Sequence, residues 1–274
     1  EPLDATELLP GEKLVWFFRH GESVGNVSRR KAIAADESRG DGLHMEENAY
    51  RNDPAMADGR LTPMGEAQAK ERAKSMRSWR LRPEVIVCSP LTRALQTAAL
   101  IFEEDLLAGV PLVIRPELRE FFPTLIECRG RPLFELRADP RLRRLAAWPA
   151  LDKALSPEAT ASWGEGWDSE LAYGHRWRQH CGDGERCVAF KRFISAQPHS
   201  RIATVSHWGT INNLVNREPC VDAARLQREP VGPLWDPKEH KCTSSGSNWP
   251  EEGIAKLEVP NAGFVAIVFS PVAT

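Results

Sequence analysis

The sequence predicts an α/β fold, with a mostly parallel central sheet flanked by helices on both faces. Short apolar runs alternate with longer segments of helical periodicity, and this order is typical of a parallel sheet. A length of 274 residues suits one large α/β domain. A hydrophobic share of 42% with nine Trp residues excludes a disordered chain.

The first half of the chain contains three predicted strands with two helices between them. The apolar run Lys13–Arg19 predicts a buried strand. Thr62 followed by Pro63 is a common helix start, so we expect a helix over residues 63–79. The same signal at Ser89 and Pro90 predicts a helix over residues 89–102. The second and third strands are expected at residues 84–88 and 111–115.

The second half continues the alternation of helices and strands. We expect helices at residues 186–196 and Trp208–Asn216, and strands at Arg201–Ser206 and residues 262–269. Residues 25–60 and 120–183 interrupt this rhythm, the first because it is polar and the second because it is rich in Trp, Pro and Arg. We expect short helices near residues 131–148. The prediction is a single domain over residues 1–274, with cap insertions at about 25–60 and 120–183.

Charge and hydropathy exclude several classes of protein. The formal net charge of −2 argues against a non-specific nucleic-acid binder, which is usually strongly basic. The longest apolar runs fall far below the roughly 18 residues that a membrane helix needs. No signal peptide is visible, and we expect a soluble protein with the cytoplasm as the favoured compartment. Of the 36 basic residues, 27 are Arg, the side chain that binds phosphate and carboxylate bidentately, although a GC-rich genome produces the same bias.

The sequence gives no indication of a metal or a cofactor. His175, His180, Cys181 and Cys187 form the densest His/Cys group, but their spacing matches no common zinc motif. No glycine-rich nucleotide-binding loop is present. Among the six cysteines, Cys88 ends an apolar run and is expected in the core. The others include two pairs close enough to form disulfides or to remain free thiols: Cys181 with Cys187, and Cys220 with Cys242.

Two histidines directly follow predicted strands. His20 follows the first strand and His207 follows Arg201–Ser206, while Arg93 lies in the first turn of the helix after the second strand. Ligands of open α/β sheets bind at the carboxyl ends of the strands, beside helix N-termini. We therefore expect these residues and Arg19 to surround one pocket suited to a phosphate dianion.

Such a pocket supports phosphoryl transfer on general chemical grounds. A neutral imidazole nitrogen can attack a phosphorus atom in line, whereas an anionic nucleophile would be repelled. Guanidinium groups neutralise the charge on the equatorial oxygens. The leaving alkoxide needs a proton, and a protonated carboxylic acid nearby can supply it.

Four sequence blocks together resemble the histidine phosphatase superfamily, also called phosphoglycerate mutase-like. In chain order they are Arg19-His20-Gly21-Glu22-Ser23 with Asn26, then Leu61-Thr62-Pro63-Met64-Gly65, then Ser89-Pro90-Leu91-Thr92-Arg93, then Ser206-His207. The plant and fungal phosphatase branch is the closest in appearance, because a long insertion follows the first block and Leu118-Arg119-Glu120 precedes Cys128-Arg129-Gly130-Arg131. The resemblance implies a three-layer α/β/α fold and spans roughly residues 13–269.

The resemblance implies a role for each matching residue. His20 matches the nucleophile that becomes phosphohistidine, and Glu120 matches the proton donor, with Glu117 and Glu22 as nearby alternatives. The other matching positions are catalytic or bind the phosphorylated substrate: Arg19, Arg93, His207, Asn26 and Ser23. The implied activity is metal-independent hydrolysis of a small phosphomonoester, with no nucleic-acid or membrane partner.

Trp208 departs from the family pattern, which usually has a small residue after the second histidine. At the pocket rim, its ring could stack on a substrate or narrow the entrance. Two alternatives to a phosphatase therefore stay open. One is a phosphoglycerate-type mutase, although residues 27–58 lack the tract typical of mutases. The other is a non-catalytic or redirected member with a binding or biosynthetic role.

Residues 119–144 contain three more Arg than acidic residues. This excess of positive charge could attract a polyanionic substrate or form a solvated helical face.

Overall fold

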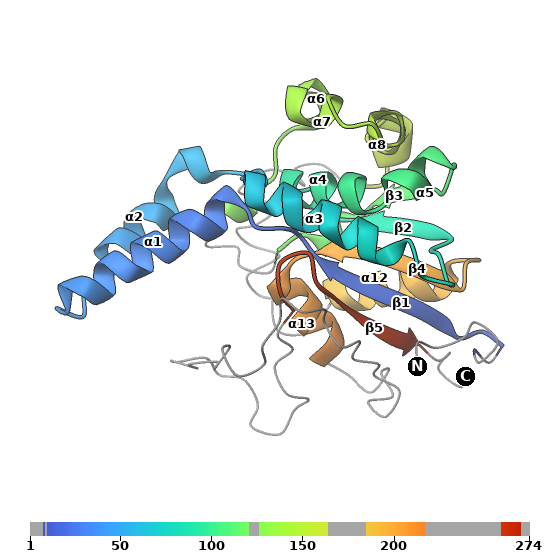
Figure 1. Cartoon of the computed structure of the whole chain (residues 1–274), viewed down its shortest axis with the longest axis horizontal. Coiled ribbons are helices and arrows are strands. Elements are labelled where there is room, and N and C mark those ends of the chain that lie inside the picture. The colour runs from blue at the N-terminus through green and yellow to red at the C-terminus, as the bar shows by residue number, and fades with distance from the viewer. Residues whose placement is uncertain (1–7, 9, 121–125, 164–184, 217–258, 270–274) are drawn as a thin grey trace.

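The computed structural model contains a five-stranded mixed sheet (Figure 1). It describes residues 8, 10–120, 126–163, 185–216 and 259–269. The strand order is β3-β2-β4-β1-β5. Neighbouring strands are parallel except β5, which runs antiparallel to β1. The strands are β1 (Lys13–Arg19), β2 (Val85–Cys88), β3 (Leu112–Ile114), β4 (Arg201–Ser206) and β5 (Phe264–Phe269).

Helices connect the strands and cover the sheet. Those that precede β3 are α1 (Val24–Arg39), α2 (Met45–Asn52), α3 (Pro63–Met76), α4 (Thr92–Ile101) and α5 (Glu103–Leu107), with the 3-10 turn η2 (Pro54–Met56). Those between β3 and β4 are η3 (Pro116–Leu118), η4 (Ile126–Cys128), α6 (Leu133–Ala138), α7 (Pro140–Arg143), α8 (Trp148–Ala154), α9 (Pro157–Thr160) and α12 (Glu185–Ala196). Helix α13 (Trp208–Asn216) follows β4. Among these described helices, none combines the length and the hydropathy needed to cross a lipid bilayer.

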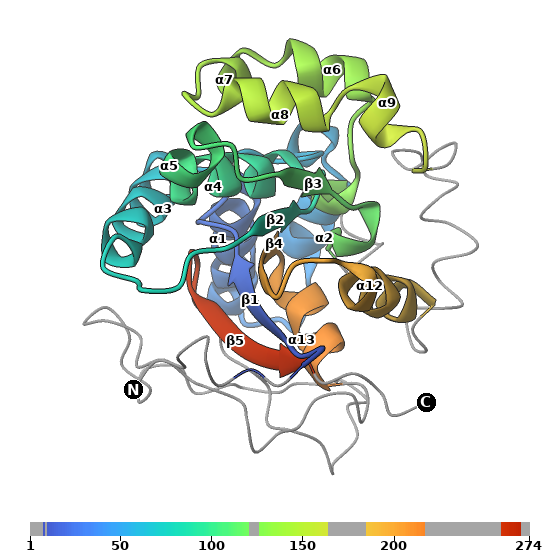
Figure 2. The same cartoon turned by 90° about the vertical axis from the view of Figure 1, so that its right-hand side faces the viewer.

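The sheet forms the middle of three layers, as the sequence predicts (Figure 2). Alternate strand residues bury opposite faces, because successive side chains of a strand point to opposite sides. One face, which includes Trp16 and Phe18, packs against α3 and α4. The other, which includes Val15 and Phe17, packs against α12 and α13.

Parallel register brings three strand ends to one edge of the sheet. Arg19 of β1 pairs with Ser206 of β4, and Cys88 of β2 pairs with Val205. The residues that follow these strands are His20, Ser89 and His207, so they lie side by side. Two backbone hydrogen bonds extend the pairing, because the N–H of His20 donates to the Ser206 carbonyl and the N–H of Ser89 donates to that of Val205.

Residues 25–60 form a pair of packed helices, α1 and α2, rather than the irregular polar insertion suggested by the sequence (Figure 1). Ser23 and Asn26 form a capping box at the start of α1. The Asp36 carboxylate accepts hydrogen bonds from the backbone N–H groups of Glu46 and Glu47, in the first turn of α2. The apolar pattern missed this pair because few of its side chains are apolar, and capping bonds fix its ends instead.

Helices α6 to α9 form an additional layer over α4, β3 and α5 (Figure 2). Fully buried leucines join this layer to the core that covers one face of the sheet: Leu136, Leu142, Leu151 and Leu155. The expected short helices near residues 131–148 are therefore present, and two more follow them.

Two predicted helices differ from the structure at their ends. Helix α3 ends at Met76 rather than residue 79. Helix α4 begins at Thr92, three residues after the predicted Ser89. Ser89 does not cap this helix, since its hydroxyl contacts His207 instead. Leu91 occupies the N-cap position and has no side-chain oxygen to cap the helix.

We predict that Gly65→Ala destabilises the fold although alanine favours helices. A Cβ atom at position 65 in α3 would lie 2.1 Å from the backbone oxygen of Glu22, so the chain must shift. We expect the free energy of unfolding to fall by about 1–3 kcal/mol in chemical denaturation. Gly59→Ala is the matched control, because its Cβ would have no neighbour closer than 3.6 Å. Equal stability of the two variants would contradict the prediction.

Candidate active site

His20 lies buried at the carboxyl end of β1, with both ring nitrogens in contact with the protein. Its Nδ1 atom lies 2.6 Å from the Gly21 carbonyl oxygen, which can only accept a hydrogen bond. Nδ1 therefore carries the proton, and Nε2 presents its lone pair. The Nε–H of Arg93 donates to Nε2 at 3.3 Å, which agrees with this tautomer.

The environment of His20 keeps its imidazole uncharged. Burial lowers its pKa well below the usual value, and the neighbouring cations Arg93 and Arg19 lower it further. The hydrogen bond to the Gly21 carbonyl acts in the opposite direction without reversing the shift. The Nε2 atom therefore keeps its lone pair at neutral pH.

Arg93 is a buried arginine in the first turn of α4. Its Nη1 donates to the Glu127 carbonyl at 2.7 Å, while its Nε contacts His20. One turn further along, the Thr97 hydroxyl donates to the Arg93 carbonyl and accepts the backbone N–H of Gly21. Helix α4 and the loop after β1 are thus joined beside the guanidinium group.

His207 faces His20 across the strand ends. Their ring centroids lie 5.0 Å apart, and His207 is fully buried. Its Nε2 lies 2.8 Å from the Ser89 hydroxyl oxygen, which also accepts the backbone N–H of Leu91. Ser89 therefore orients the ring of His207.

Arg19 and Trp208 lie next to the two histidines in the chain. Arg19 is partly buried, and its Nη1 donates to the Val259 carbonyl at 3.0 Å. Its influence on the pKa of His20 places its positive charge within electrostatic reach of that ring. Trp208 is half-buried and opens α13, where its carbonyl accepts a hydrogen bond from the Asn212 side chain.

Ser23 and Asn26, predicted to bind substrate, hydrogen-bond to each other at the start of α1. The Ser23 hydroxyl accepts the backbone N–H of Asn26, and the Asn26 side-chain carbonyl accepts the backbone N–H of Ser23. In this arrangement the Ser23 hydroxyl and the Asn26 amide nitrogen keep their hydrogen-bond donors.

The three candidate proton donors lie in different electrostatic surroundings. Glu117 forms a two-bond ion pair with Arg115. Burial acts to raise the pKa of Glu22, but its hydrogen bonds with Arg30 and Thr62 outweigh burial and lower it. Burial acts to lower the pKa of Arg93, but nearby negative groups raise it, Glu127 the most and the partly buried Glu120 less. Glu22 and Glu117 are thus committed to other cations, whereas Glu120 lies within electrostatic reach of Arg93.

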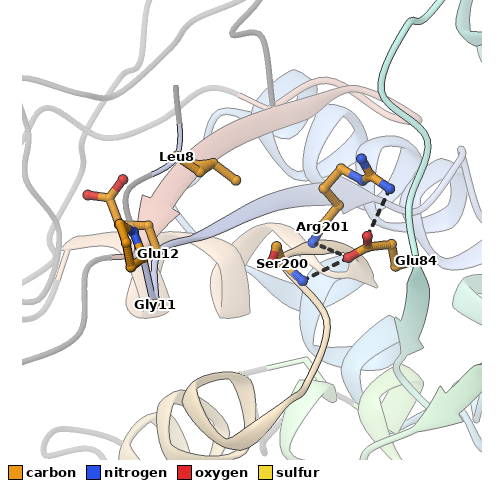
Figure 3. A pocket seen from close by; sticks show the side chains of 7 residues that line it. Leu8, Gly11, Glu12, Glu84, Ser200 and Arg201 are labelled. Atoms are coloured by element: carbon orange, nitrogen blue, oxygen red, sulfur yellow. Dashed lines mark hydrogen bonds and ion pairs between the residues drawn. The ribbon is translucent and has the colours of Figure 1, made fainter. Parts of the chain in front are cut away.

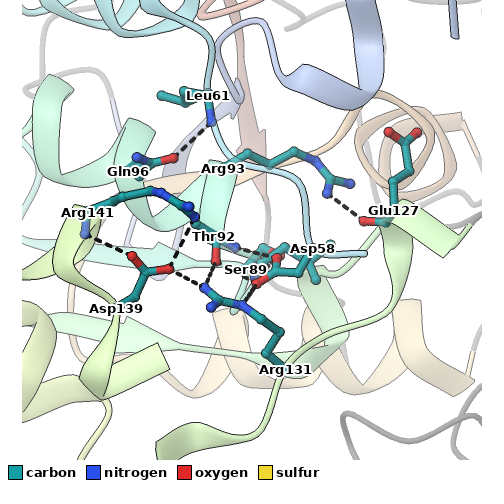
Figure 4. A network of polar contacts seen from close by, with 11 residues as sticks. Asp58, Leu61, Ser89, Thr92, Arg93, Gln96, Glu127, Arg131, Asp139 and Arg141 are labelled. Carbon is teal, nitrogen blue, oxygen red and sulfur yellow. Dashed lines mark hydrogen bonds and ion pairs between the residues drawn. The ribbon is translucent and has the colours of Figure 1, made fainter. Parts of the chain in front are cut away.

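Several residues that surround Arg93 were not predicted from the sequence. Asp58 is buried beside the first turn of α4, Gln96 accepts the backbone N–H of Leu61, and Glu127 bonds to Arg93 (Figure 4). Asp58 precedes Leu61-Thr62 by only three residues, and this proximity to a recognised block is the one signal that could have drawn attention to it.

A pocket of about 370 Å³ lies at the opposite end of the sheet (Figure 3). It lies beside Arg201, where β4 begins, whereas the histidines follow the strand ends. The Glu84 carboxylate there is fully engaged, because it accepts both backbone N–H groups of Ser200 and Arg201 and pairs with the Arg201 guanidinium. The pocket is therefore separate from the histidine site.

Among the described residues, no group of three or more His, Cys, Asp or Glu side chains is arranged to hold a metal ion. The His/Cys group that matches no zinc motif lies outside the described residues, since these exclude His175, His180, Cys181 and the side chain of Cys187. Cys220 and Cys242 also lie outside them. Cys88 and Cys128 are buried, and neither forms a disulfide.

The chain belongs to the histidine phosphatase superfamily, branch 1, whose model matches residues 46–234. This range contains Arg93, Glu120 and His207, and in the structure Arg93 and His207 contact His20, which precedes the range. No curated protein matches the chain.

The solved structures that the chain resembles include two phosphatases and a mutase. The α-ribazole phosphatase of Shigella flexneri is 22% identical over 73% of this chain and 77% of its own, with a TM-score of 0.38. A mycobacterial glucosyl-3-phosphoglycerate phosphatase is 18% identical over 74% and 79%, with a TM-score of 0.36. The phosphoglycerate mutase of Bacillus anthracis is 15% identical over 94% and 88%, with a TM-score of 0.45.

We predict that the neutral state of His20 makes stability depend on pH. In the unfolded chain a histidine binds a proton below about pH 6.5, whereas folded His20 stays neutral to lower pH. The unfolded state then holds more protons, so the free energy of unfolding falls as pH drops from about 6.5 toward the folded pKa. The contribution is at most about 1.4 kcal/mol per pH unit.

The measurement is urea denaturation between pH 7.5 and pH 5 on the wild type and on His20→Gln. Other groups titrate in both proteins, so the difference between the two slopes isolates His20. The wild type should lose stability more steeply. Parallel curves would show that His20 binds a proton equally well in the folded and unfolded states.

Proposed function

We propose that the protein is a metal-independent phosphatase that hydrolyses a small phosphomonoester through a phosphohistidine on His20. The observation that carries this proposal is the buried, uncharged imidazole, whose Nε2 lone pair faces the Nε–H of Arg93. When a phosphoryl group binds at Nε2, the Arg93 guanidinium would turn from the lone pair to the phosphoryl oxygens and neutralise part of their charge. Membership of the histidine phosphatase superfamily supports the same chemistry.

In the first step Nε2 of His20 attacks the phosphorus atom, and the bond from phosphorus to the ester oxygen breaks. The leaving alkoxide takes a proton from Glu120, which becomes a carboxylate. The hydrogen bond from Nδ1 to the Gly21 carbonyl strengthens as the ring gains positive charge. The loop after β1 therefore stabilises the phosphorylated ring.

In the second step a water molecule attacks the phosphohistidine. Glu120 takes a proton from this water, and the nitrogen–phosphorus bond breaks to release inorganic phosphate and neutral His20. Arg19, Arg93 and His207 act in both steps by neutralising the phosphoryl oxygens. Ser23 and Asn26 can donate further hydrogen bonds from the start of α1, and the Trp208 ring would contact the substrate at the rim of the pocket.

We predict that His20 carries an acid-labile phosphate during turnover. The wild type, mixed with ³²P-labelled phosphomonoester and quenched in alkali, should retain label that acid removes. His20→Ala should retain none and lose activity by at least about a thousandfold, because the covalent route is closed. The assay contains a chelator, because the proposed reaction needs no metal ion. Full activity of His20→Ala would refute the proposal, and transfer of phosphate within the substrate without release would indicate a mutase.

We predict that the cost of Glu120→Gln depends on the leaving group. An alkyl phosphate needs a proton on its departing alkoxide, so its hydrolysis should slow by about 10²–10⁴-fold. p-Nitrophenolate is a stable leaving group without a proton. The rate at which p-nitrophenyl phosphate phosphorylates His20 should therefore fall far less than the rate for an alkyl phosphate. Glu117→Gln is the matched control, because Glu117 pairs with Arg115. An equal loss for both substrates in Glu120→Gln would contradict a proton-donor role.

A further inference from the structure

Helix α4, which carries Arg93, is capped by a residue outside the helix. Its N-cap residue Leu91 has no side-chain oxygen that could accept a backbone N–H of the first turn. The capping oxygen comes instead from Asp58, which lies 34 residues before Thr92. One Asp58 carboxylate oxygen accepts the backbone N–H of Thr92 at 2.7 Å, and the other accepts the Thr92 hydroxyl at 2.5 Å. A carboxylate at this position also interacts favourably with the helix dipole.

Asp58 is held in place against two costs. Its backbone φ of 45° lies in the left-handed region, which is unfavourable for residues other than glycine. Its side chain is fully buried, and a buried charge needs a partner. Both costs are tolerated only because the surrounding structure fixes Asp58, and Arg131 is its ionic partner.

Arg131 joins three segments through one guanidinium group (Figure 4). Its Nε donates to Asp58 at 2.9 Å, and its Nη2 donates to the Thr92 hydroxyl at 2.8 Å. The same Nη2 lies 2.7 Å from the carboxylate of Asp139, which caps α7. The group therefore connects the loop before α3, the start of α4 and the layer of α6 to α9.

The segment that carries Arg131 also holds Arg93 directly. Glu127 lies four residues before Arg131, and its carbonyl accepts Nη1 of Arg93 at 2.7 Å. Consecutive residues of α4, Thr92 and Arg93, are thus bound by Arg131 and Glu127 of one short segment. Displacement of this segment would move the start of α4 and release the Arg93 guanidinium at the same time.

We propose that Arg131, acting through Asp58 and Thr92, is a positioning residue for Arg93, so that the Arg93 guanidinium is aligned on the phosphoryl group only while the layer of α6 to α9 is seated on α4. The inference rests on the proposed phosphoryl transfer at His20 and extends it. The planar guanidinium of arginine is required at this position. The single ammonium group of a lysine could not contact Asp58, Thr92 and Asp139 in the same arrangement.

The test compares Arg131→Met with Arg144→Met. Arg144 also forms an ion pair with the main body, but its partner is Glu66 of α3 rather than a residue of α4. The burst of p-nitrophenol from p-nitrophenyl phosphate measures phosphorylation of His20, and calorimetry measures affinity for inorganic phosphate. Arg131→Met should slow the burst by at least about tenfold and weaken phosphate binding, well below its melting temperature. Arg144→Met should stay within about twofold of the wild type.

A second variant keeps the test valid if Arg131→Met fails to fold with Asp58 left unpaired. The double variant Asp58→Asn with Arg131→Met removes the buried charge, and an asparagine can still accept the backbone N–H of Thr92. The same loss of burst rate and phosphate affinity is expected. Arg131→Lys adds a third measurement, since it should recover melting temperature without recovering the burst.

The proposal is overturned if a folded Arg131→Met or double variant keeps the wild-type burst and phosphate affinity, or if Arg131→Lys restores both. Failure of the proposed function gives a different result. In that case the wild type itself shows no burst and no labelled His20, and phosphate affinity alone then reports on the arrangement of Arg93.

Discussion

The hydrogen bond from Nε of Arg93 to Nε2 of His20 exists only while the imidazole is uncharged, because a protonated Nε2 has no lone pair to accept it. The rest of the site follows from this condition. The Gly21 carbonyl holds the single ring proton on the other nitrogen. Burial and the arginine charges disfavour a second proton. The same cations that exclude a proton from the ring can attract a phosphate dianion to it, so one arrangement of charge prepares both the nucleophile and its substrate.

A buried arginine beside an uncharged histidine needs compensation elsewhere. The Glu127 carbonyl compensates part of the burial of Arg93 by accepting a hydrogen bond from its guanidinium. The Asp58 carboxylate does the same for the start of α4 by accepting the backbone N–H of Thr92. Asp58 in turn requires Arg131, and Arg131 requires Asp139. These hydrogen bonds and ion pairs form a connected network that leads from the surroundings of His20 to the layer of α6 to α9. The electrostatics of the centre are thus linked to the layer of α6 to α9 through Asp58 and Arg131.

Much of the fold and the centre of the site could be predicted from the sequence. The strands have short apolar runs, and parallel pairing then places His20 and His207 together by register alone. The pair of helices α1 and α2 could not be predicted, because capping by Ser23 and Asp36 fixes its ends and few side chains are apolar. The start of α4 was misplaced for a related reason. Its cap comes from Asp58, and no local pattern encodes a hydrogen bond across 34 residues.

The pairing of β1 with β4 has a consequence for how the chain acquires its chemistry. The strand that ends beside His20 completes its sheet only when residues near 201–206 arrive, and the Thr204 hydroxyl reaches the Trp16 carbonyl across 188 positions. During synthesis the amino-terminal end emerges first, and contacts of such long range are slow to close. A growing chain therefore displays its His20 segment long before it can place His207 beside it. A nascent chain that ends before His207 therefore lacks the two-histidine centre.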